Sequence, residues 1–199
     1  MAHEVELFHS KATLNDGTEL ATPVWRIDSG EEGHHLAMLA AQHGNEVQGV
    51  EVARRFRDVC AEQLVAGSVT LVPYANLLAI RHRRHSSDLG PEQSGRDSRG
   101  FNMQQAWPGD RAGNDIERVV YALDQQVIAG CDRLVDMHCW NHFWAAAVLA
   151  RSDNEVAVQM AEATDLPFVM RRTAPAPEAD IATSSHLMYS RGGVSMAIE

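Results

Sequence analysis

The sequence predicts an α/β fold in which helices cover both faces of a sheet, a three-layer α/β/α arrangement. Short β-rich runs alternate with longer helical patterns, which is typical of βαβ units and a largely parallel sheet. Residues 36–40 form a near-continuous apolar run, as a strand covered on both faces requires. The chain has 199 residues and 45% apolar content, which is ordinary for one globular domain with a sizeable core.

Strands and helices are expected to alternate along the chain. Apolar residues at helical spacing predict the helices, and short apolar runs predict the strands. Asn114 and Glu117 form a capping-box pattern at the start of one helix, and Gly130 is its stop signal. The expected strands are residues 5–8, 24–27, 36–40, 68–73, 134–137, 145–150, 168–171 and 194–198, and the expected helices are about 46–67, 114–129 and 153–164.

Residues 76–113 interrupt this alternation, because they show little apolar periodicity and are rich in Gly, Ser, Arg and Asp. A structureless stretch of that length is uncommon inside a compact domain and is often functional. It also holds a cluster of arginines that could meet an anionic group, namely Arg81, Arg83, Arg84, Arg96 and Arg99.

Composition excludes several classes of partner. The formal net charge of −10 argues against nucleic-acid binding, which needs a basic face to displace phosphate counterions. The three cysteines form neither an even set nor a CxxC pair, so a reducing cytoplasm is expected. The first residues lack the pattern of a signal peptide, and no apolar run approaches the roughly 20 residues that span a bilayer. We therefore expect a cytoplasmic protein that binds no membrane, and a homo-oligomer is left open.

His43 and Glu46 are the first candidates for chemistry. They lie between a buried strand and the next helix, where open α/β sheets place their ligands. With Gly44 allowing a sharp bend, an imidazole nitrogen and a carboxylate can converge on one ion. The alternative is a helix start at which Glu46 complements the dipole and His43 is a loop residue. His34 and His35 are set aside, because an exposed histidine is more often unliganded.

His138 supplies a further ligand, because it ends the apolar strand at 134–137 and emerges at the same sheet edge. Ligands of His, Glu and His type leave the fourth tetrahedral position for water, as in catalytic zinc. Water acidified by the metal can be the nucleophile. Asp136 points to the same side of its strand as His138, where it either orients that histidine or is a structural carboxylate.

Short motifs are spaced along nearly the whole chain. They are His43-Gly44-Asn45-Glu46 with Gly49, Val72-Pro73 and Asn76 followed by arginines, Ala106-Trp107-Pro108-Gly109, Asp136-Met137-His138 and Ala197-Ile198-Glu199. In this order they resemble the succinylglutamate desuccinylase and aspartoacylase branch of the zinc carboxypeptidase-like hydrolases. The resemblance implies a zinc carboxypeptidase-like fold with a mixed, mostly parallel, doubly wound sheet. It also implies a small β-rich domain after the catalytic domain, which residues 1–199 would lack.

The resemblance assigns roles to residues of this chain. It implies one zinc ion per chain, held by His43, Glu46 and His138. Glu199 matches the late glutamate that acts as general base, a role that amide hydrolysis also requires on chemical grounds. Arg84 best matches the arginine that polarises the scissile carbonyl, and Arg83 lies close enough to leave the assignment open.

One motif departs from the family in a way that concerns the substrate. Relatives carry Asn-Arg where this chain has Gln104 and Gln105, counted back from Pro108-Gly109. The family arginine would bind a substrate carboxylate through a bidentate fork, whereas a glutamine offers a neutral amide. Either another arginine, such as Arg96 or Arg99, replaces it, or the substrate lacks that carboxylate. The candidate substrate-binding residues are Asn102, Gln104, Gln105 and Arg83, although tight turns also recruit Asn for backbone reasons.

These observations predict a zinc-dependent amide hydrolase that deacylates a small N-acylated amino acid or related amine. A carboxypeptidase-like enzyme that cleaves short peptides is one alternative, and the missing arginine weighs against it. A catalytically degenerate binding module of the same fold is another, favoured by Gln104 and Gln105. Retention of the three ligands together with Glu199 favours an enzyme.

Overall fold

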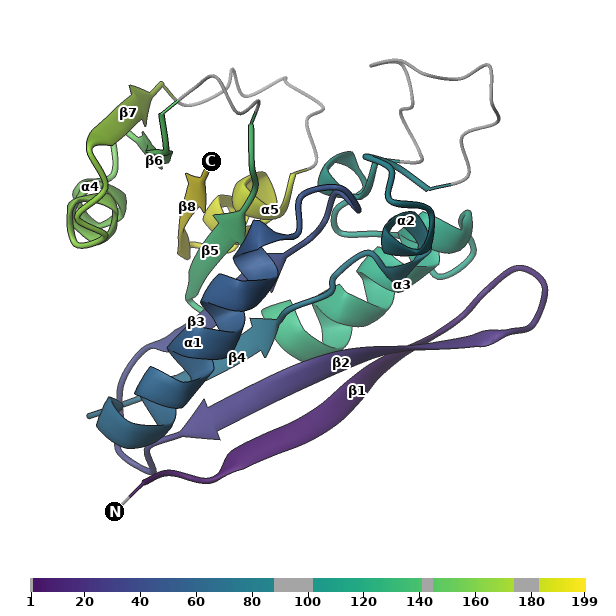
Figure 1. The fold of residues 1–199 in the computed structure, drawn as a ribbon, viewed down its shortest axis with the longest axis horizontal. Helices are drawn as coiled ribbons and strands as arrows, with labels where there is room; N and C mark the ends of the chain where they lie inside the picture. The colour runs from purple at the N-terminus through teal and green to yellow at the C-terminus, as the bar shows by residue number, and fades with distance from the viewer. Residues whose placement is uncertain (1, 88–101, 141–144, 174–182) are drawn as a thin grey trace.

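The fold is built on one eight-stranded sheet, seen in a computed structural model that describes residues 2–87, 102–140, 145–173 and 183–199 (Figure 1). The strands are β1 (Val5–Thr13), β2 (Glu19–Asp28), β3 (His35–Ala40), β4 (Ser68–Val72), β5 (Arg133–Met137), β6 (Ala147–Arg151), β7 (Phe168–Arg172) and β8 (Val194–Ile198). Their order across the sheet is β1-β2-β4-β3-β5-β8-β6-β7. Strands that are distant in sequence, such as β5 and β8, are thus neighbours.

The sheet is mixed. Parallel pairing joins β3 to both β4 and β5, β5 to β8, and β6 to β7. Antiparallel pairing joins β1 to β2, β2 to β4, and β6 to β8. Because β3, β5 and β8 are adjacent and parallel, their carboxyl ends meet at the same edge of the sheet. The expected mixed, mostly parallel sheet is therefore confirmed.

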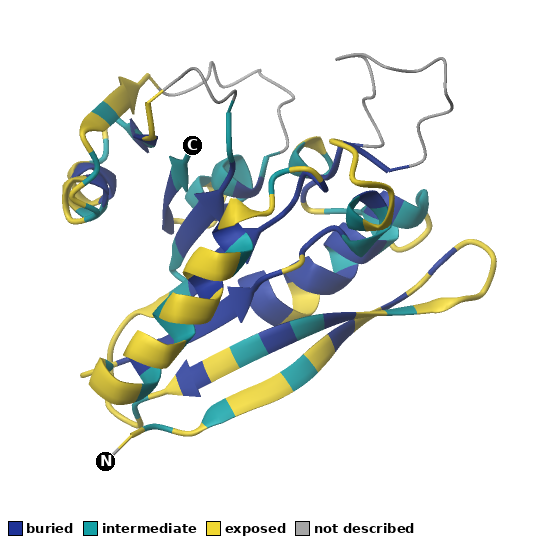
Figure 2. Ribbon diagram, in the orientation of Figure 1, coloured by how far each residue is buried: buried dark blue, intermediate teal, exposed yellow. Residues whose placement is uncertain are grey.

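Helices cover both faces of the sheet, which confirms the three-layer α/β/α arrangement. Helices α1 and α4 pack on one face, and α3 and α5 pack on the other. Figure 2 shows that α1 turns an exposed surface away from the sheet. The helical elements are α1 (Gln48–Gln63), α2 (Leu77–His82), the 3₁₀ turn η1 (Met103–Gln105), α3 (Asp115–Leu123), the π-helical turn η2 (Asp124–Ile128), α4 (Glu155–Glu162) and α5 (Ser184–Ser190).

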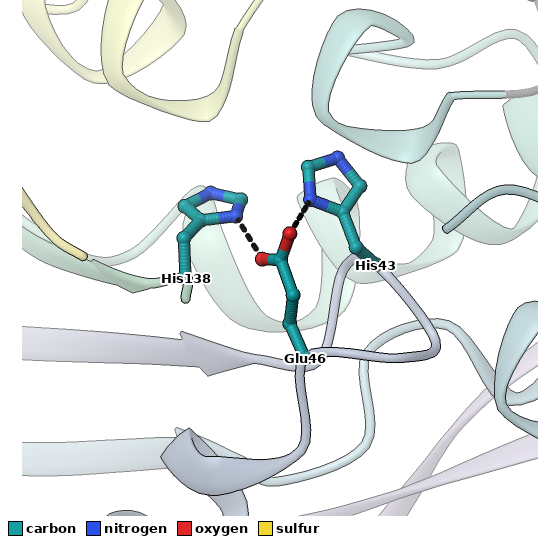
Figure 3. Close-up of side chains that lie close together, drawn as sticks. All are labelled: His43, Glu46 and His138. Atoms are coloured by element: carbon teal, nitrogen blue, oxygen red, sulfur yellow. Dashed lines mark hydrogen bonds and ion pairs between the residues drawn. The ribbon is translucent and has the colours of Figure 1, made fainter. Parts of the chain in front are cut away.

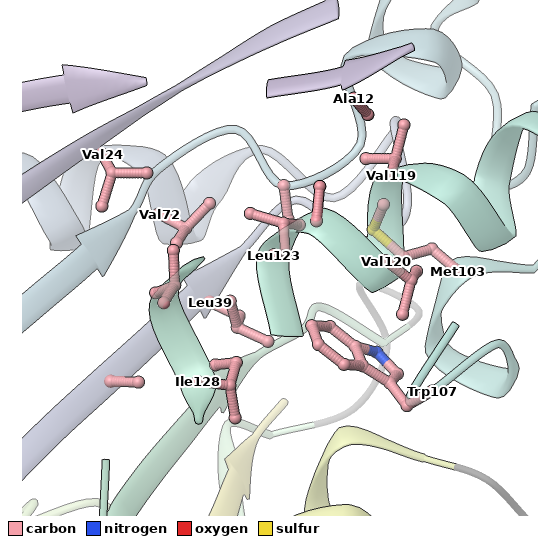
Figure 4. Close-up of a cluster of buried hydrophobic side chains, with 14 of the residues drawn as sticks. Ala12, Val24, Leu39, Val72, Met103, Trp107, Val119, Val120, Leu123 and Ile128 are labelled. Atoms are coloured by element: carbon pink, nitrogen blue, oxygen red, sulfur yellow. The ribbon is translucent and has the colours of Figure 1, made fainter. Parts of the chain in front are cut away.

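Alternation along the strands divides the apolar core into two clusters. In β3, Leu39 faces α3, whereas Met38 faces the side covered by α1 and α4. In the first cluster, Trp107 and Met103 fill the space between α3 and the sheet (Figure 4). Full burial of a side chain such as Leu39 contributes about 1.5–3 kcal/mol. The central strands are therefore firmly held, and the polar residues at their ends project from a rigid base.

The structure corrects the expectation that residues 76–113 are structureless. They contain α2 and η1, and residues 88–101 lie outside the described part. Helix α2 begins where the side chain of Asn76 accepts a hydrogen bond from the Ala79 amide at 3.0 Å. A helix of so few residues is too short for apolar periodicity to reveal it. The same is true of α5, which the sequence did not predict.

Other helix boundaries also differ from expectation. The capping box of Asn114 and Glu117 is confirmed at the start of α3. That helix continues beyond Leu123 as a π-helical turn instead of an α-helix. Helix α1 begins at Gln48, which leaves Glu46 in the preceding loop. Within the described ranges, no helix is both long and apolar enough to cross a bilayer.

Candidate metal centre

The candidate metal ligands lie at the carboxyl ends of β3 and β5. These two parallel strands end at Ala40 and Met137, which are paired in register. His43 follows β3 in the loop that leads to α1, and His138 directly follows β5. Ligand atoms of His43, Glu46 and His138 all lie within 4.8 Å of one another. The structure thus brings together three side chains from two distant segments of the chain.

Glu46 lies between the two histidines (Figure 3). One of its oxygens is 3.0 Å from Nδ1 of His43, and the other is 3.1 Å from Nδ1 of His138. The side chains of His43, Glu46 and His138 are only 6%, 13% and 2% exposed. Two imidazole nitrogens and a carboxylate turned toward a common point are the ligand types of catalytic zinc. These residues could hold a metal ion, and their chemistry fits zinc.

Electrostatics keep the glutamate ionised. Burial opposes its charge, but hydrogen bonds from His138 and His43 outweigh burial and lower the pKa of Glu46 to about 2. Burial likewise opposes the charged form of His138, but the neighbouring Asp136 and Glu46 carboxylates raise its pKa well above the usual value. The Glu46 and Asp136 carboxylates therefore favour a positive charge in the centre. When no metal is bound, a proton on His138 supplies that charge.

The loop that carries His43 is packed tightly against α2. A Cβ added to Gly44 would lie 2.2 Å from the carbonyl carbon of Ala79, so only glycine fits there without a shift of the backbone. Beyond α2, the ring of His85 stacks on the ring of His43 with centroids 3.6 Å apart and planes 21° apart. The stack and the close approach of the backbone both restrict the orientation of His43.

Asn102 lies behind His43. Its side-chain oxygen is 3.1 Å from Nε2 of His43 and also accepts a hydrogen bond from the Gln104 amide at 3.0 Å. Because a backbone N–H can only donate, this oxygen is an acceptor, and Nε2 of His43 is the donor. That bond holds the ring with Nδ1 toward Glu46, where a metal would take the place of any hydrogen on Nδ1. The observed contact of Asn102 is thus with a candidate ligand, whereas the sequence suggested a contact with substrate.

Asp136 lies behind His138 in the same way. Its Oδ1 is 3.1 Å from Nε2 of His138, and its side chain is 2% exposed. Gln42 and Ser184 donate further hydrogen bonds to this carboxylate. Sequence reasoning anticipated the Asp136 contact as one of two alternatives, but it missed Gln42 and Ser184. The signal for Gln42 was its place directly before His43 at the end of a buried strand.

Glu199 emerges beside His138, because β8 pairs in parallel with β5. Its backbone exchanges two hydrogen bonds with Ala147, at 2.9 and 3.0 Å, so the residue is held in the sheet. Burial raises the pKa of the Glu199 carboxyl, the His138 charge opposes that rise, and the Glu46 carboxylate adds to it. A carboxyl group with a raised pKa beside a metal centre is suited to accept and return a proton.

A pocket of about 310 Å³ adjoins the centre. Glu199 and Gln104 line it together with Asp136, Arg172 and Tyr189. The amide nitrogen of Gln104 is also 3.3 Å from Nε2 of His138. The pocket is therefore lined in part by two neighbours of His138, Gln104 and Asp136, and its surface contains both a neutral amide and a guanidinium group.

The remaining candidates lie farther out or beyond the described residues. Arg83 and Arg84 are exposed at the end of α2, directly before the stacked His85. Gln105 is exposed at the end of η1. Arg96 and Arg99 lie outside the described residues. The roles of these arginines and of Gln105 in catalysis or substrate binding stay predictions.

Comparison with known proteins identifies the family of this chain. Residues 32–191 match the model of the succinylglutamate desuccinylase/aspartoacylase catalytic domain. Because this match covers most of the chain, the protein belongs to that family. A curated relative is N-alpha-acetyl-L-2,4-diaminobutyric acid deacetylase from Halomonas elongata, 24% identical over 116 residues. Those residues are 58% of this chain and 31% of the relative.

Solved structures share the fold. An aspartoacylase family protein from Mesorhizobium loti superposes with a TM-score of 0.80 at 23% identity, over 99% of this chain and 61% of that one. A metallo-carboxypeptidase from Burkholderia cenocepacia superposes with a TM-score of 0.63 at 16% identity, over 100% of this chain and 55% of that one. The chain thus spans less than two thirds of the length of these relatives, and its fold is zinc carboxypeptidase-like.

Proposed function

We propose that the protein is a zinc-dependent amide hydrolase that removes the acyl group from a small N-acylated amino acid or related amine. The convergence of His43, Glu46 and His138 beside Glu199 carries this proposal. One zinc ion per chain would be held by the two Nδ1 nitrogens and the Glu46 carboxylate. Family membership and the deacetylase named among the relatives support the reaction class.

A metal held in this centre would polarise the acyl carbonyl and lower the pKa of a water molecule. The chain itself would move the protons. Glu199 would accept one proton as water attacks the amide and would return it to the nitrogen of the leaving amine. Arg84, or its neighbour Arg83, would stabilise the charge that develops on the carbonyl oxygen.

The pocket beside Glu199 is where we place the substrate. Gln104 lines it where relatives would carry a polar motif residue, and it offers hydrogen bonds but no charge. Arg172 lines the same pocket and could pair with a carboxylate on the substrate. We propose Asn102, Gln104, Gln105 and Arg83 as residues that shape this end of the site, with Asn102 acting through His43.

Two alternatives follow from the same centre. A carboxypeptidase-like enzyme would use the same ligands on short peptides, and a binding module would keep the metal without turnover. We favour an enzyme over a binding module, because a binder has no use for a carboxyl group with a raised pKa beside the centre. We favour deacylation over peptide cleavage, because the curated relative is a deacetylase. Residues 1–199 would then be the catalytic domain of an enzyme that in longer relatives continues beyond this length. The three free cysteines support a cytoplasmic setting.

Metal analysis combined with a substrate panel tests the proposal. Purified protein should contain zinc in a ratio of about one per chain and should release amine from N-acyl amino acids faster than from dipeptides. Chelation should abolish the activity, and added zinc should restore it. Faster cleavage of dipeptides would favour the peptidase, and zinc without turnover on either panel would favour the binding module. Absence of zinc binding would overturn all three.

A further inference from the structure

We propose that Gln42, held by Trp107, is a positioning residue that determines which ring nitrogen of His138 faces the metal. It acts through Asp136, and the three residues form a chain of hydrogen bonds from the core to the candidate ligand. The inference rests on the proposed metal centre. It assigns a role to the side chains of Gln42 and Trp107, which are not among the candidate ligands.

The first step is the bond between Trp107 and Gln42. Nε1 of Trp107 lies 2.8 Å from Oε1 of Gln42, and both side chains are buried. An indole N–H is a donor only, so the atom that faces it must be the amide oxygen. The ring of Trp107 is fixed by the core cluster around α3 (Figure 4). Trp107 therefore fixes the orientation of the Gln42 amide.

The second step follows from that orientation. With its oxygen on Trp107, Gln42 must turn its amide nitrogen toward Asp136, and Nε2 lies 2.7 and 2.8 Å from the two carboxylate oxygens. The hydroxyl of Ser184 donates to Oδ2 of the same carboxylate at 2.6 Å. These donors surround Asp136, so it acts as an acceptor toward its remaining neighbour.

The third step concerns the histidine. Oδ1 of Asp136 is 3.1 Å from Nε2 of His138 and Glu46 is 3.1 Å from Nδ1, so a metal that binds at Nδ1 leaves the ring hydrogen on Nε2, where Asp136 accepts it. Asp136 thus holds the ring with Nδ1 toward Glu46 and the centre. A carboxylate behind a ligand histidine fixes the ring and its tautomer. Here the orientation of the Gln42 amide, which donates to that carboxylate, is set by Trp107 in the core.

Gln104 offers the competing arrangement. Its amide nitrogen is 3.3 Å from Nε2 of His138 and could donate to it. That bond would place the ring hydrogen on Nδ1, where it would block a metal. Asp136 is nearer and is the stronger acceptor, because hydrogen bonds to a charged group are roughly twice as strong as neutral ones. Loss of the Gln42 donors should let the two arrangements compete.

Trp107→Phe tests the first step, because it keeps the ring and removes the donor. The zinc dissociation constant, measured by competition with a chelator, should rise about 10–100-fold, as is typical when a partner of a ligand is lost. Trp25→Phe is the matched control, since Trp25 lies on β2 under Arg57 and away from the centre. Equal zinc affinity in Trp107→Phe and the wild type would overturn the proposal.

Gln42→Met provides the second test, in case Trp107→Phe does not fold. It keeps the volume of Gln42 and removes both its acceptor and its donors, and it should weaken zinc binding at least as much as Trp107→Phe. Gln126→Met is the control, because Gln126 is exposed and bonds the Lys11 backbone at the surface. Unchanged affinity in Gln42→Met would overturn the proposal by itself.

Long-range ¹⁵N–¹H spectra of the histidine rings separate this inference from the proposed function. In metal-free protein, the hydrogen on Nε2 of His138 should be bonded to Asp136 in the wild type and should exchange slowly with solvent. In Gln42→Met the same hydrogen should exchange measurably faster. This result would support the positioning role even if the wild type bound no zinc. Absence of a hydrogen on Nε2 of wild-type His138 would overturn it even if zinc bound tightly.

Discussion

The two ends of β3 and β5 carry the same residue types in different surroundings. At the amino ends, His34 pairs with Asp132 at 2.6 Å, and these side chains are 68% and 43% exposed. At the carboxyl ends, His138 lies 3.1 Å from Asp136, and both side chains are 2% exposed. A histidine and an aspartate within bonding distance therefore occur at both edges of the sheet. The difference lies in burial and in the neighbours.

Burial decides what each pair can do. Water screens the exposed pair, and such pairs typically contribute about 0–1 kcal/mol. The buried pair is stable only because further donors and Glu46 compensate for its desolvation. Across the described ranges, His43, Glu46 and His138 are the only group of three or more acidic, histidine or cysteine side chains close enough to hold an ion. A histidine beside a carboxylate can thus be an ordinary surface pair, as at His34. Burial beside further ligands makes the His138 pair part of a candidate metal centre.

The largest difference between the two edges should appear on removal of a histidine. His138→Ala should abolish zinc binding and deacylation, because it removes one of three ligands. His34→Ala should leave both unchanged. Zinc content by atomic spectroscopy and amine release report the two effects. If zinc were retained in His138→Ala, the metal would lie elsewhere in the protein.

Glu199→Gln should separate metal binding from turnover. The amide keeps the size of the carboxyl group but cannot accept a proton, so kcat should fall about 10²–10⁴-fold. Zinc content should remain near one per chain, because Glu199 is not among the proposed ligands. Steady-state kinetics and metal analysis on the same preparation measure both. A variant with normal kcat would assign the general base to another group.

The pH dependence of zinc binding should sharpen the comparison. In metal-free protein the pKa of His138 is raised, so this ring holds a proton at pH values where an ordinary histidine is neutral. Zinc must displace that proton. Affinity should therefore increase up to about tenfold per pH unit until the pH exceeds the raised pKa, and then level off. Calorimetry in buffers of different ionisation enthalpy would count the protons released. Release of no proton near neutral pH would contradict the raised pKa.

The smallest effect is expected at the amino ends. Asp132→Asn removes the charge that faces His34 and Arg133, and the free energy of unfolding should fall by less than about 1 kcal/mol. Asp132→Asn should leave zinc binding unchanged. Asp136→Asn, in contrast, should weaken zinc binding, because an amide in place of the carboxylate can turn a donor toward His138. Urea denaturation and chelator competition measure the two quantities. Equal effects of the two substitutions on zinc would show that enclosure is not the deciding difference.

Much of the fold could be predicted from the sequence, because its signals are local. The apolar run of β3 and the capping box of α3 depend on residues close together in the chain. Helix α5 could not be predicted, because it is short and its apolar residues are secured by contacts with β5 and β8. The insertion of β8 between β5 and β6 was equally hidden, since strand order depends on long-range pairing.

The ligands of the candidate site could be predicted from the sequence, whereas the residues that hold these ligands in place could not. Each ligand follows or precedes a recognisable element, so its edge of the sheet could be inferred. The bond between Trp107 and Gln42 joins residues 65 apart in sequence, and that between Gln42 and Asp136 joins residues 94 apart. No local pattern encodes such distances. A general signal existed at Trp107, because a buried indole usually finds an acceptor for its N–H.

The pairing of Ala40 with Met137 has a consequence for any attempt to rebuild this protein. Side chains alternate between the two faces of a strand, so a slip of β5 by one residue would exchange the sides of Asp136 and Met137. It would also shift His138 by about 3.3 Å along the strand. The positions of the candidate ligands at the sheet edge are thus set by the register of β3 and β5. A transplant of the loops alone would lose that register, so β3 and β5 would have to be transferred with the loops.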